Sequence, residues 1–170
     1  LEPRKNIPGL LDAYHHLRAS LPDAPPLVLV GRRGWLYNDI FRQVEALRLA
    51  EHVRWLEGVS SDDLPAVYNG AAVLALPSHY EGFGLTALEA MACGTPVVAS
   101  DRSSVPEVVG EAGLLVDPDD VDAIADAIRR VLTDEALRAD LRAAGLDRAA
   151  GFTWQRTAET VLSVYRALLA

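Results

Sequence analysis

The residues with the clearest chemical potential lie in one stretch, PSHYEGFGLTALEAMACGTPVVAS, at positions 77–100. Gly82 and Gly84 let backbone amides come close to a ligand, because glycine has no side chain to hold the ligand away. A helix predicted to begin near Leu85 points its unbonded N–H groups at the same place. Thr86 adds a hydroxyl in the first turn of that helix. A helix start of this kind favours an anion, and a diphosphate fits the pattern.

Two glutamates flank this turn. Glu81 lies in the loop before the predicted helix, and Glu89 lies about one turn inside it. A carboxylate accepts hydrogen bonds from paired sugar hydroxyls, so a ribose beside a diphosphate is a natural partner for one of them. The alternative is a charge that balances the helix dipole, and for Glu89 taken alone this alternative is favoured.

The segments around this stretch alternate between strand and helix. Short, branched runs predict strands at 26–31, 53–58, 71–78, 95–100 and 113–117. Apolar residues at helical spacing predict helices at 6–22, 36–50, 60–70 and 85–93. This alternation predicts an α/β fold with a doubly wound, Rossmann-like parallel sheet that is covered on both faces. The residues after Asp117 carry only helical periodicity and predict a C-terminal helical tail.

Composition narrows the class of protein. At 170 residues the chain fits a single domain, and its hydrophobic content of 50% is typical of a globular protein. The formal charge of −8, with arginines interleaved among acids, argues against a nucleic-acid partner. Cys93 is the single cysteine, which excludes a disulfide framework and predicts a small buried packing residue in a reducing compartment. No apolar run approaches the roughly 18 residues that cross a bilayer, and the first residues lack a signal-peptide pattern, so we predict a cytoplasmic domain.

Residues 81–100 resemble the signature of the retaining glycosyltransferases called group 1, or family 4. In that signature seven residues separate two glutamates, in a context like E-GFGL-x-x-LEAMA-x-G-x-PVVAS. The glutamate spacing alone is weak evidence, but the Gly-Phe-Gly turn and the PVVAS strand make the match specific. The resemblance covers essentially residues 1–170. It implies a single nucleotide-sugar-binding domain, the C-terminal donor-binding half of the two-Rossmann (GT-B) architecture.

The resemblance also implies roles for individual residues. Lys5, by itself an ordinary solvated lysine, would neutralise the leaving diphosphate, and Glu89 would hold the ribose hydroxyls. Gly31 and Val59 follow predicted strands, where ligands of doubly wound sheets collect, and would line the base pocket. From the residues alone they are a turn glycine and a core residue. The catalytic residues would be Glu81 and Lys5, and the donor-binding residues Glu89, Phe83, Gly84, Leu85, Thr86, Gly31 and Val59.

Two parts of the family pattern are missing from this sequence. One is a strand that ends in Gly-Arg and whose arginine shares the diphosphate with the lysine. The other is the N-terminal domain that carries the acceptor site. The missing strand would lie in the middle of a sheet of order 3-2-1-4-5-6. We therefore predict that the strands after Val28 and Val73 do not pair directly, and that residues outside the sequence or a neighbouring chain supply the strand between them.

The implied activity is transfer of a hexose from a UDP-, GDP- or ADP-sugar to an acceptor hydroxyl with retained anomeric configuration. This chain alone is expected to bind the donor without completing a transfer, because the missing domain binds the acceptor. The missing domain is also a route to peripheral contact with the inner membrane. No cofactor and no metal site are predicted, since no carboxylate pair of the kind that holds a metal between phosphates is evident.

Three alternatives remain beside this interpretation. A nucleotide-sugar epimerase of the GT-B type would use the same donor cleft without an acceptor. An inactive nucleotide-sugar-binding module would keep donor binding alone. A dinucleotide-binding oxidoreductase domain is disfavoured, because no G-x-G-x-x-G follows an early strand.

Overall fold

The computed structural model describes residues 2–32 and 37–169. Within these residues the strands form two parallel sheets. One sheet pairs β1 (Leu27–Val30) with β2 (Val53–Leu56), and the other has the order β3 (Leu74–Leu76), β4 (Val97–Ser100), β5 (Leu114–Val116). The predicted parallel arrangement is therefore confirmed. The strand predicted at 71–78 is shorter in the structure than its apolar run.

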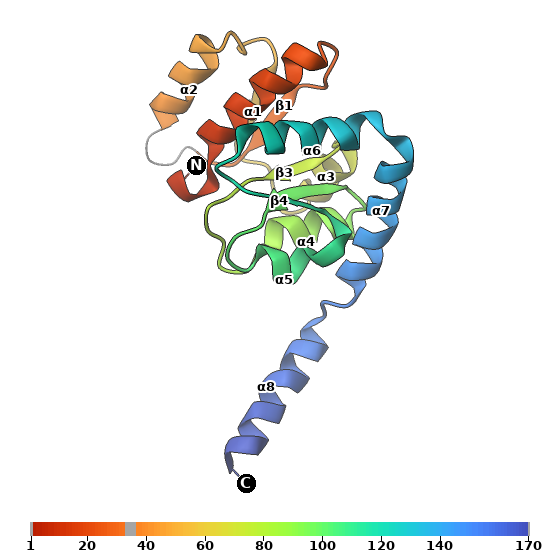
Figure 1. The fold of residues 1–170 in the computed structure, drawn as a ribbon. Coiled ribbons are helices and arrows are strands. Elements are labelled where there is room, and N and C mark those ends of the chain that lie inside the picture. Colours follow the sequence, from red (N-terminus) through yellow and green to blue (C-terminus); the bar gives the residue numbers. More distant parts are fainter. Residues whose placement is uncertain (1, 33–36, 170) are drawn as a thin grey trace.

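Helices connect successive strands along the chain (Figure 1). They are η1 (Pro3–Lys5), α1 (Ile7–Ser20), α2 (Tyr37–Ala46), α3 (Leu64–Gly70), α4 (Leu85–Ala92), α5 (Val105–Val109), η2 (Gly110–Ala112), α6 (Val121–Thr133), α7 (Glu135–Ala150) and α8 (Trp154–Leu169). The predicted helix at 36–50 has its predicted start at Leu36, and that residue lies outside the described part of the chain. Its described part ends at Ala46, and Arg48 adopts a left-handed backbone with φ 56° that stops a helix.

The apolar core has two parts, one on each face of the sheet that contains β4. All four residues of β4 are buried. Val98 packs with α1 and α6, whereas Val97 and Ala99 pack with α4 and α5 on the opposite face. Successive side chains of a strand point to opposite faces, so complete burial of β4 requires helices on both sides. The predicted α/β fold is confirmed, and both faces of β4 are covered by helices as predicted.

The two sheets separate between β1 and β3. The prediction that these strands do not pair directly is therefore confirmed, while the source of a strand between them stays a prediction. Val28, Val30 and Leu56 are 39–41% exposed, which is high for branched residues in a parallel sheet. One face of the β1–β2 sheet thus carries apolar side chains without full cover.

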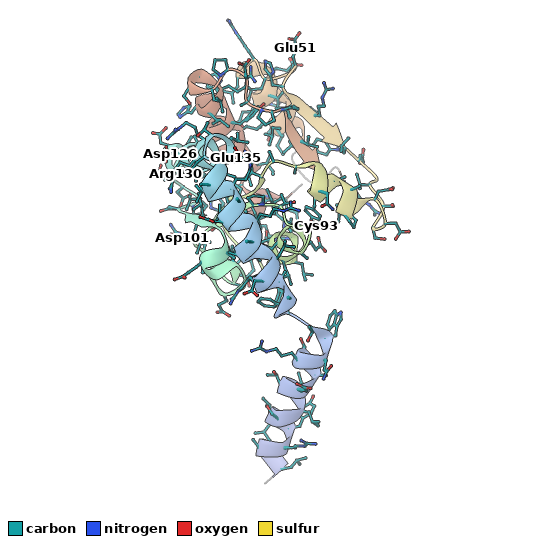
Figure 2. The ribbon with its side chains drawn as sticks, turned by 90° about the vertical axis from the view of Figure 1, so that its right-hand side faces the viewer. Glu51, Cys93, Asp101, Asp126, Arg130 and Glu135 are labelled. Carbon is teal, nitrogen blue, oxygen red and sulfur yellow. The ribbon has the colours of Figure 1, made fainter. Side chains whose placement is uncertain are left out.

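The predicted helical tail consists of three helices with different environments. Asp134 ends α6 and caps α7, because its side chain accepts a hydrogen bond from the N–H of Leu137 at 3.0 Å. α6 packs against α1 as part of the core, and α7 runs beside α4. α8 has no buried residue and stands away from the rest of the chain (Figure 2). No helix in the described ranges is both long and apolar enough to cross a membrane.

Cys93 follows the last residue of α4 and is half-buried. The prediction that Cys93 packs in the core holds only in part, because the side chain is half-buried and not fully buried. The side chain lies at the edge of the apolar cluster around Met91 and packs against it only in part.

Candidate functional site

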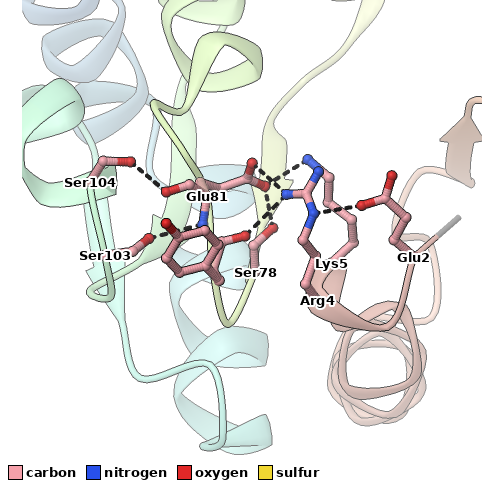
Figure 3. Close-up of polar contacts among 8 residues, drawn as sticks. Glu2, Arg4, Lys5, Ser78, Glu81, Ser103 and Ser104 are labelled. Carbon is pink, nitrogen blue, oxygen red and sulfur yellow. Dashed lines mark hydrogen bonds and ion pairs between the residues drawn. The ribbon is translucent and has the colours of Figure 1, made fainter.

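Glu81 lies at the centre of a polar cluster where the first residues of the chain meet the loop after β3 (Figure 3). Its Oε1 accepts hydrogen bonds from Lys5 Nζ at 2.6 Å and from Ser78 Oγ at 2.7 Å. Its Oε2 accepts a hydrogen bond from Arg4 Nη1 at 2.9 Å. Lys5 and Glu81 are 76 positions apart in the sequence, so the fold brings the two predicted catalytic residues into direct contact.

The backbone of Glu81 is held as firmly as its side chain. Its N–H donates to Ser103 Oγ at 2.9 Å, and its carbonyl accepts from Ser104 Oγ at 2.8 Å. On the other side of the loop, the N–H of His79 donates to the carbonyl of Arg4 at 2.8 Å. The loop after β3 is therefore fixed between the start of α5 and the η1 segment. This fixation orients the carboxylate toward Lys5.

The cluster keeps Glu81 ionised. The residue is 7% exposed, and burial alone would raise the pKa of its carboxyl group. Hydrogen bonds from Lys5, Ser78 and Arg4, together with the charge of Lys5, outweigh burial and lower the pKa below its ordinary value. Glu81 is thus suited to accept hydrogen bonds from a ligand's hydroxyls and unsuited to donate a proton near neutral pH.

The turn after Glu81 leaves the start of α4 open. Gly84 adopts a left-handed backbone with φ 98°, and no side chain caps the helix there. Among the described residues, no acceptor is bonded to the N–H groups of Leu85 and Thr86. Phe83 and Leu85 are exposed, and Thr86 is half-buried. The predicted helix start at Leu85 is confirmed, and its free amides point at an accessible surface, as an anion site requires.

Glu89 lies on the exposed side of α4. Its Oε2 accepts a hydrogen bond from the hydroxyl of Tyr68, which reaches it from α3 at 2.8 Å. Burial, and then the hydrogen bond to Glu89, raise the pKa of the Tyr68 hydroxyl. The hydroxyl consequently stays protonated and remains a donor. The hydrogen bond from Tyr68 therefore holds the Glu89 carboxylate in place although Glu89 is exposed to solvent.

Gly31 and Val59 lie after β1 and β2, which are adjacent parallel strands. The N–H of Gly31 donates to the carbonyl of Leu56 at 3.0 Å, and Val59 is half-buried. Because parallel strands end at one edge, these residues lie at the same edge of the sheet, as predicted. A cavity of about 180 Å³ lies between α2 and the β1–β2 sheet, lined by Leu29, Ile40, Phe41, Val44, Glu45, Ala50, Val53 and Trp55.

The comparison with known families decides the assignment. The model for the family "Glycosyl transferases group 1" matches residues 1–148. The chain belongs to this family of group 1 glycosyl transferases. It is 45% identical over 168 residues to an O-antigen chain mannosyltransferase B of Escherichia coli. The aligned region covers 99% of this chain and 44% of that protein. The chain thus spans less than half the length of this curated relative.

Solved structures share the fold of this group 1 glycosyl transferase chain. A sucrose-phosphate synthase from Thermosynechococcus elongatus superposes with a TM-score of 0.86 at 34% identity, over 99% of this chain and 43% of that one. Anabaena HepE, solved in complex with UDP-glucose, superposes with a TM-score of 0.84 at 26% identity, over 96% of this chain and 46% of that one. The Rossmann-like half of a GT-B glycosyltransferase is therefore the fold of the chain.

Four residues of the candidate site were not predicted from the sequence. They form hydrogen bonds with Glu81 or Glu89: Arg4, Tyr68, Ser103 and Ser104. Arg4 had one signal, its position next to Lys5, whereas a tyrosine or serine in another element carries none. Within the described ranges, no group of three or more His, Cys, Asp or Glu side chains is arranged to hold a metal ion.

Proposed function

We propose that this chain is the donor-binding domain of a retaining, family 4 glycosyltransferase that transfers a hexose from a nucleotide-diphosphate sugar to an acceptor hydroxyl. The observation that carries the proposal is the contact of Lys5 Nζ with Glu81 Oε1 at 2.6 Å, beside the open start of α4. A mobile ammonium, a fixed carboxylate and free backbone amides are the groups that a sugar diphosphate needs. Lys5 comes from η1, whereas Glu81 and the amides belong to the loop after β3 and the α4 start that follows it.

In the proposed reaction, the bond between the anomeric carbon and the diphosphate oxygen breaks, and the electron pair leaves with the diphosphate. Lys5 and the N–H groups of Leu85 and Thr86 would stabilise the charge that develops there. Glu81 would accept a hydrogen bond from a hydroxyl of the sugar, and Phe83 and Gly84 would lie along it. The acceptor oxygen then bonds to the same face of the sugar and passes its proton to the departing diphosphate, which retains the anomeric configuration.

The donor is proposed to be a nucleoside diphosphate sugar, with Glu89 on the ribose and with Gly31 and Val59 beside the base. A complex of HepE with UDP-glucose, at 26% identity, supports a nucleotide-sugar donor. The relative named as a mannosyltransferase, at 45% identity over this half, makes mannose the first sugar to test. Donor binding is proposed to need no metal and no cofactor, because Lys5 and the α4 start supply the positive charge.

The acceptor is proposed to bind to a part of the protein outside this chain. The 44% share of the relative's length leaves room for a second domain. α8 would offer that part an apolar face, since Trp154, Tyr165 and Leu168 are 60–90% exposed. A further strand, from the same protein or another chain, is proposed to fill the gap between β1 and β3. We also propose that the protein lies in the cytoplasm, with peripheral contact to the inner membrane through the part outside this chain. Cell fractionation tests this placement.

Isothermal calorimetry with UDP, GDP, ADP and their mannose and glucose derivatives tests the proposal. We expect one base series to bind, binding to survive EDTA, and Glu89→Ala to weaken it. Incubation of the full-length protein with donor and candidate acceptors, followed by NMR of the product's anomeric proton, tests retention. Equal or absent binding of all three nucleotides would refute the donor site, and an epimerised donor without acceptor would identify an epimerase.

A further inference from the structure

Tyr68 is the partner that the structure gives to Glu89. Its hydroxyl donates to Glu89 Oε2 at 2.8 Å, across the gap between α3 and α4. Tyr68 is 9% exposed and belongs to the apolar cluster on this face of the sheet, whereas Glu89 is exposed. In the described part of the chain, this is the hydrogen bond that the Glu89 carboxylate makes. A buried aromatic ring therefore holds an otherwise exposed, flexible side chain.

The position of Tyr68 is itself fixed relative to α4. Thr95 Oγ1 donates to the carbonyl of Tyr68 at 2.7 Å, and the N–H of Thr95 donates to the carbonyl of Ala90 at 2.9 Å. Thr95 is 3% exposed, so these bonds are shielded from water. The tyrosine hydroxyl is consequently held at a defined place beside the helix that carries Glu89. A glutamate tethered at one oxygen loses little further freedom when it binds a ligand.

We infer that Tyr68 is a positioning residue that orients Glu89 to recognise the ribose diol of the donor nucleotide. The inference rests on the proposed function, in which Glu89 holds the ribose. The Tyr68 hydroxyl occupies Oε2 and leaves Oε1 to accept a hydrogen bond from a ribose hydroxyl. Tyr68 acts through Glu89 and does not itself need to touch the ligand. Its effect must therefore depend on the ribose hydroxyls.

The test measures the ratio of two affinities in the full-length protein. For whichever of UDP, GDP and ADP binds, calorimetry compares the ribonucleotide with its 2′-deoxy and 3′-deoxy analogues. We expect Tyr68→Phe to weaken ribonucleotide binding about three- to tenfold, because Glu89 would then have to be ordered when the ligand binds. Affinity for the analogue that lacks the contacted hydroxyl should stay the same. Equal weakening of all three ligands, or none, would overturn the inference.

Tyr14→Phe is the matched control. Tyr14 is a buried tyrosine of α1 on the opposite face of the sheet, and its hydroxyl donates to the carbonyl of Pro25 at 2.9 Å. Loss of this hydroxyl should lower thermal stability by an amount similar to Tyr68→Phe. It should leave the ribonucleotide-to-deoxynucleotide ratio unchanged. A change of that ratio in Tyr14→Phe would show that the ratio reports general stability and would overturn the inference.

Glu89→Ala removes the acceptor and separates failure of this inference from failure of the proposed function. If Glu89→Ala leaves the ratio of ribonucleotide to deoxynucleotide affinity unchanged, Glu89 does not contact the ribose, and both the inference and that part of the proposed function are wrong. If Glu89→Ala reduces the ratio to one but Tyr68→Phe does not change it, only the inference is wrong. If both variants reduce the ratio, and the double variant reduces it no further than Glu89→Ala alone, the inference holds.

Discussion

Removal of the charge of Glu81 should weaken the fold and strengthen diphosphate binding at the same time. The perturbation is Glu81→Gln, which keeps the shape of the side chain and removes the anion that now pairs with Lys5. The Lys5 side chain is 26% exposed and the Glu81 side chain 8% exposed, so the pair is neither a surface pair nor a fully buried one. Exposed pairs contribute up to about 1 kcal/mol, whereas breaking a buried pair costs about 3 to 5 kcal/mol. We therefore expect a loss of about 2 kcal/mol in the free energy of unfolding.

A loss of that size lowers the melting temperature of a domain of this length by about 4 to 8 °C. Urea unfolding of the wild type, Lys5→Met, Glu81→Gln and the double variant gives the coupling energy between the two residues. We expect at least about 1 kcal/mol of coupling. Glu2→Gln is the matched control, because Glu2 also pairs with Arg4 but its side chain is 59% exposed. It should change stability by less than about 0.5 kcal/mol.

Calorimetry with a nucleoside diphosphate separates the structural role of Lys5, its ion pair with Glu81, from its proposed role in binding the diphosphate. Glu81→Gln frees the ammonium, so a nucleoside diphosphate without sugar should bind at least as tightly as to the wild type. Lys5→Met should weaken the same ligand and destabilise the fold together. The reasoning is refuted if the two single variants are additive in stability, or if Glu81→Gln weakens the diphosphate as much as Lys5→Met does.

Three further predictions concern pH and the turns. Folding lowers the pKa of Glu81, so the contribution of its carboxylate to stability is complete above the ordinary glutamate pKa of about 4.3. That contribution is lost as the pH falls through the lower pKa of the folded state. The coupling energy between Lys5 and Glu81, measured by urea unfolding, should therefore be equal at pH 7 and pH 5.5. Gly84→Ala should lower stability by about 1 to 2 kcal/mol, because Gly84 has φ 98°, while Gly82→Ala, with open space around the added methyl group, should change it little in thermal unfolding. Gly113→Ala should cost about 1 to 3 kcal/mol in urea unfolding, because its Cβ would lie 2.8 Å from the backbone oxygen of Val97.

The sequence predicts most of the fold because its strands and helices have different periods. The run around β4 is short and branched, and every residue of that strand is buried in the structure. Predicted ends are less accurate, since the left-handed backbone of Arg48 that ends α2 has no strong local signal in an arginine. The environment of α6 was also not predictable, because the same helical periodicity describes α6 in the core and α8 in solvent.

The candidate site divides in the same way. The turn through Gly84 and the start of α4 follow from local signals, namely glycines before a helical pattern. The contact between Lys5 and Glu81 joins residues 76 positions apart, and only the resemblance to a family suggested it. The supporting hydroxyls of Tyr68 and Ser103 come from other elements and depend on tertiary packing. No spacing rule selects one serine or tyrosine among several.

The charges of the cluster explain why the open turn matters to the proposed site. Lys5 and Arg4 face Glu81, and Arg4 also pairs with Glu2, so two positive charges meet two negative charges. A balanced cluster gives little attraction to an anion in a chain whose formal charge is −8. The unbalanced element is the start of α4, where amides lack acceptors among the described residues. In the proposed function, an arriving diphosphate would therefore meet the α4 amides first and then compete with Glu81 for Lys5.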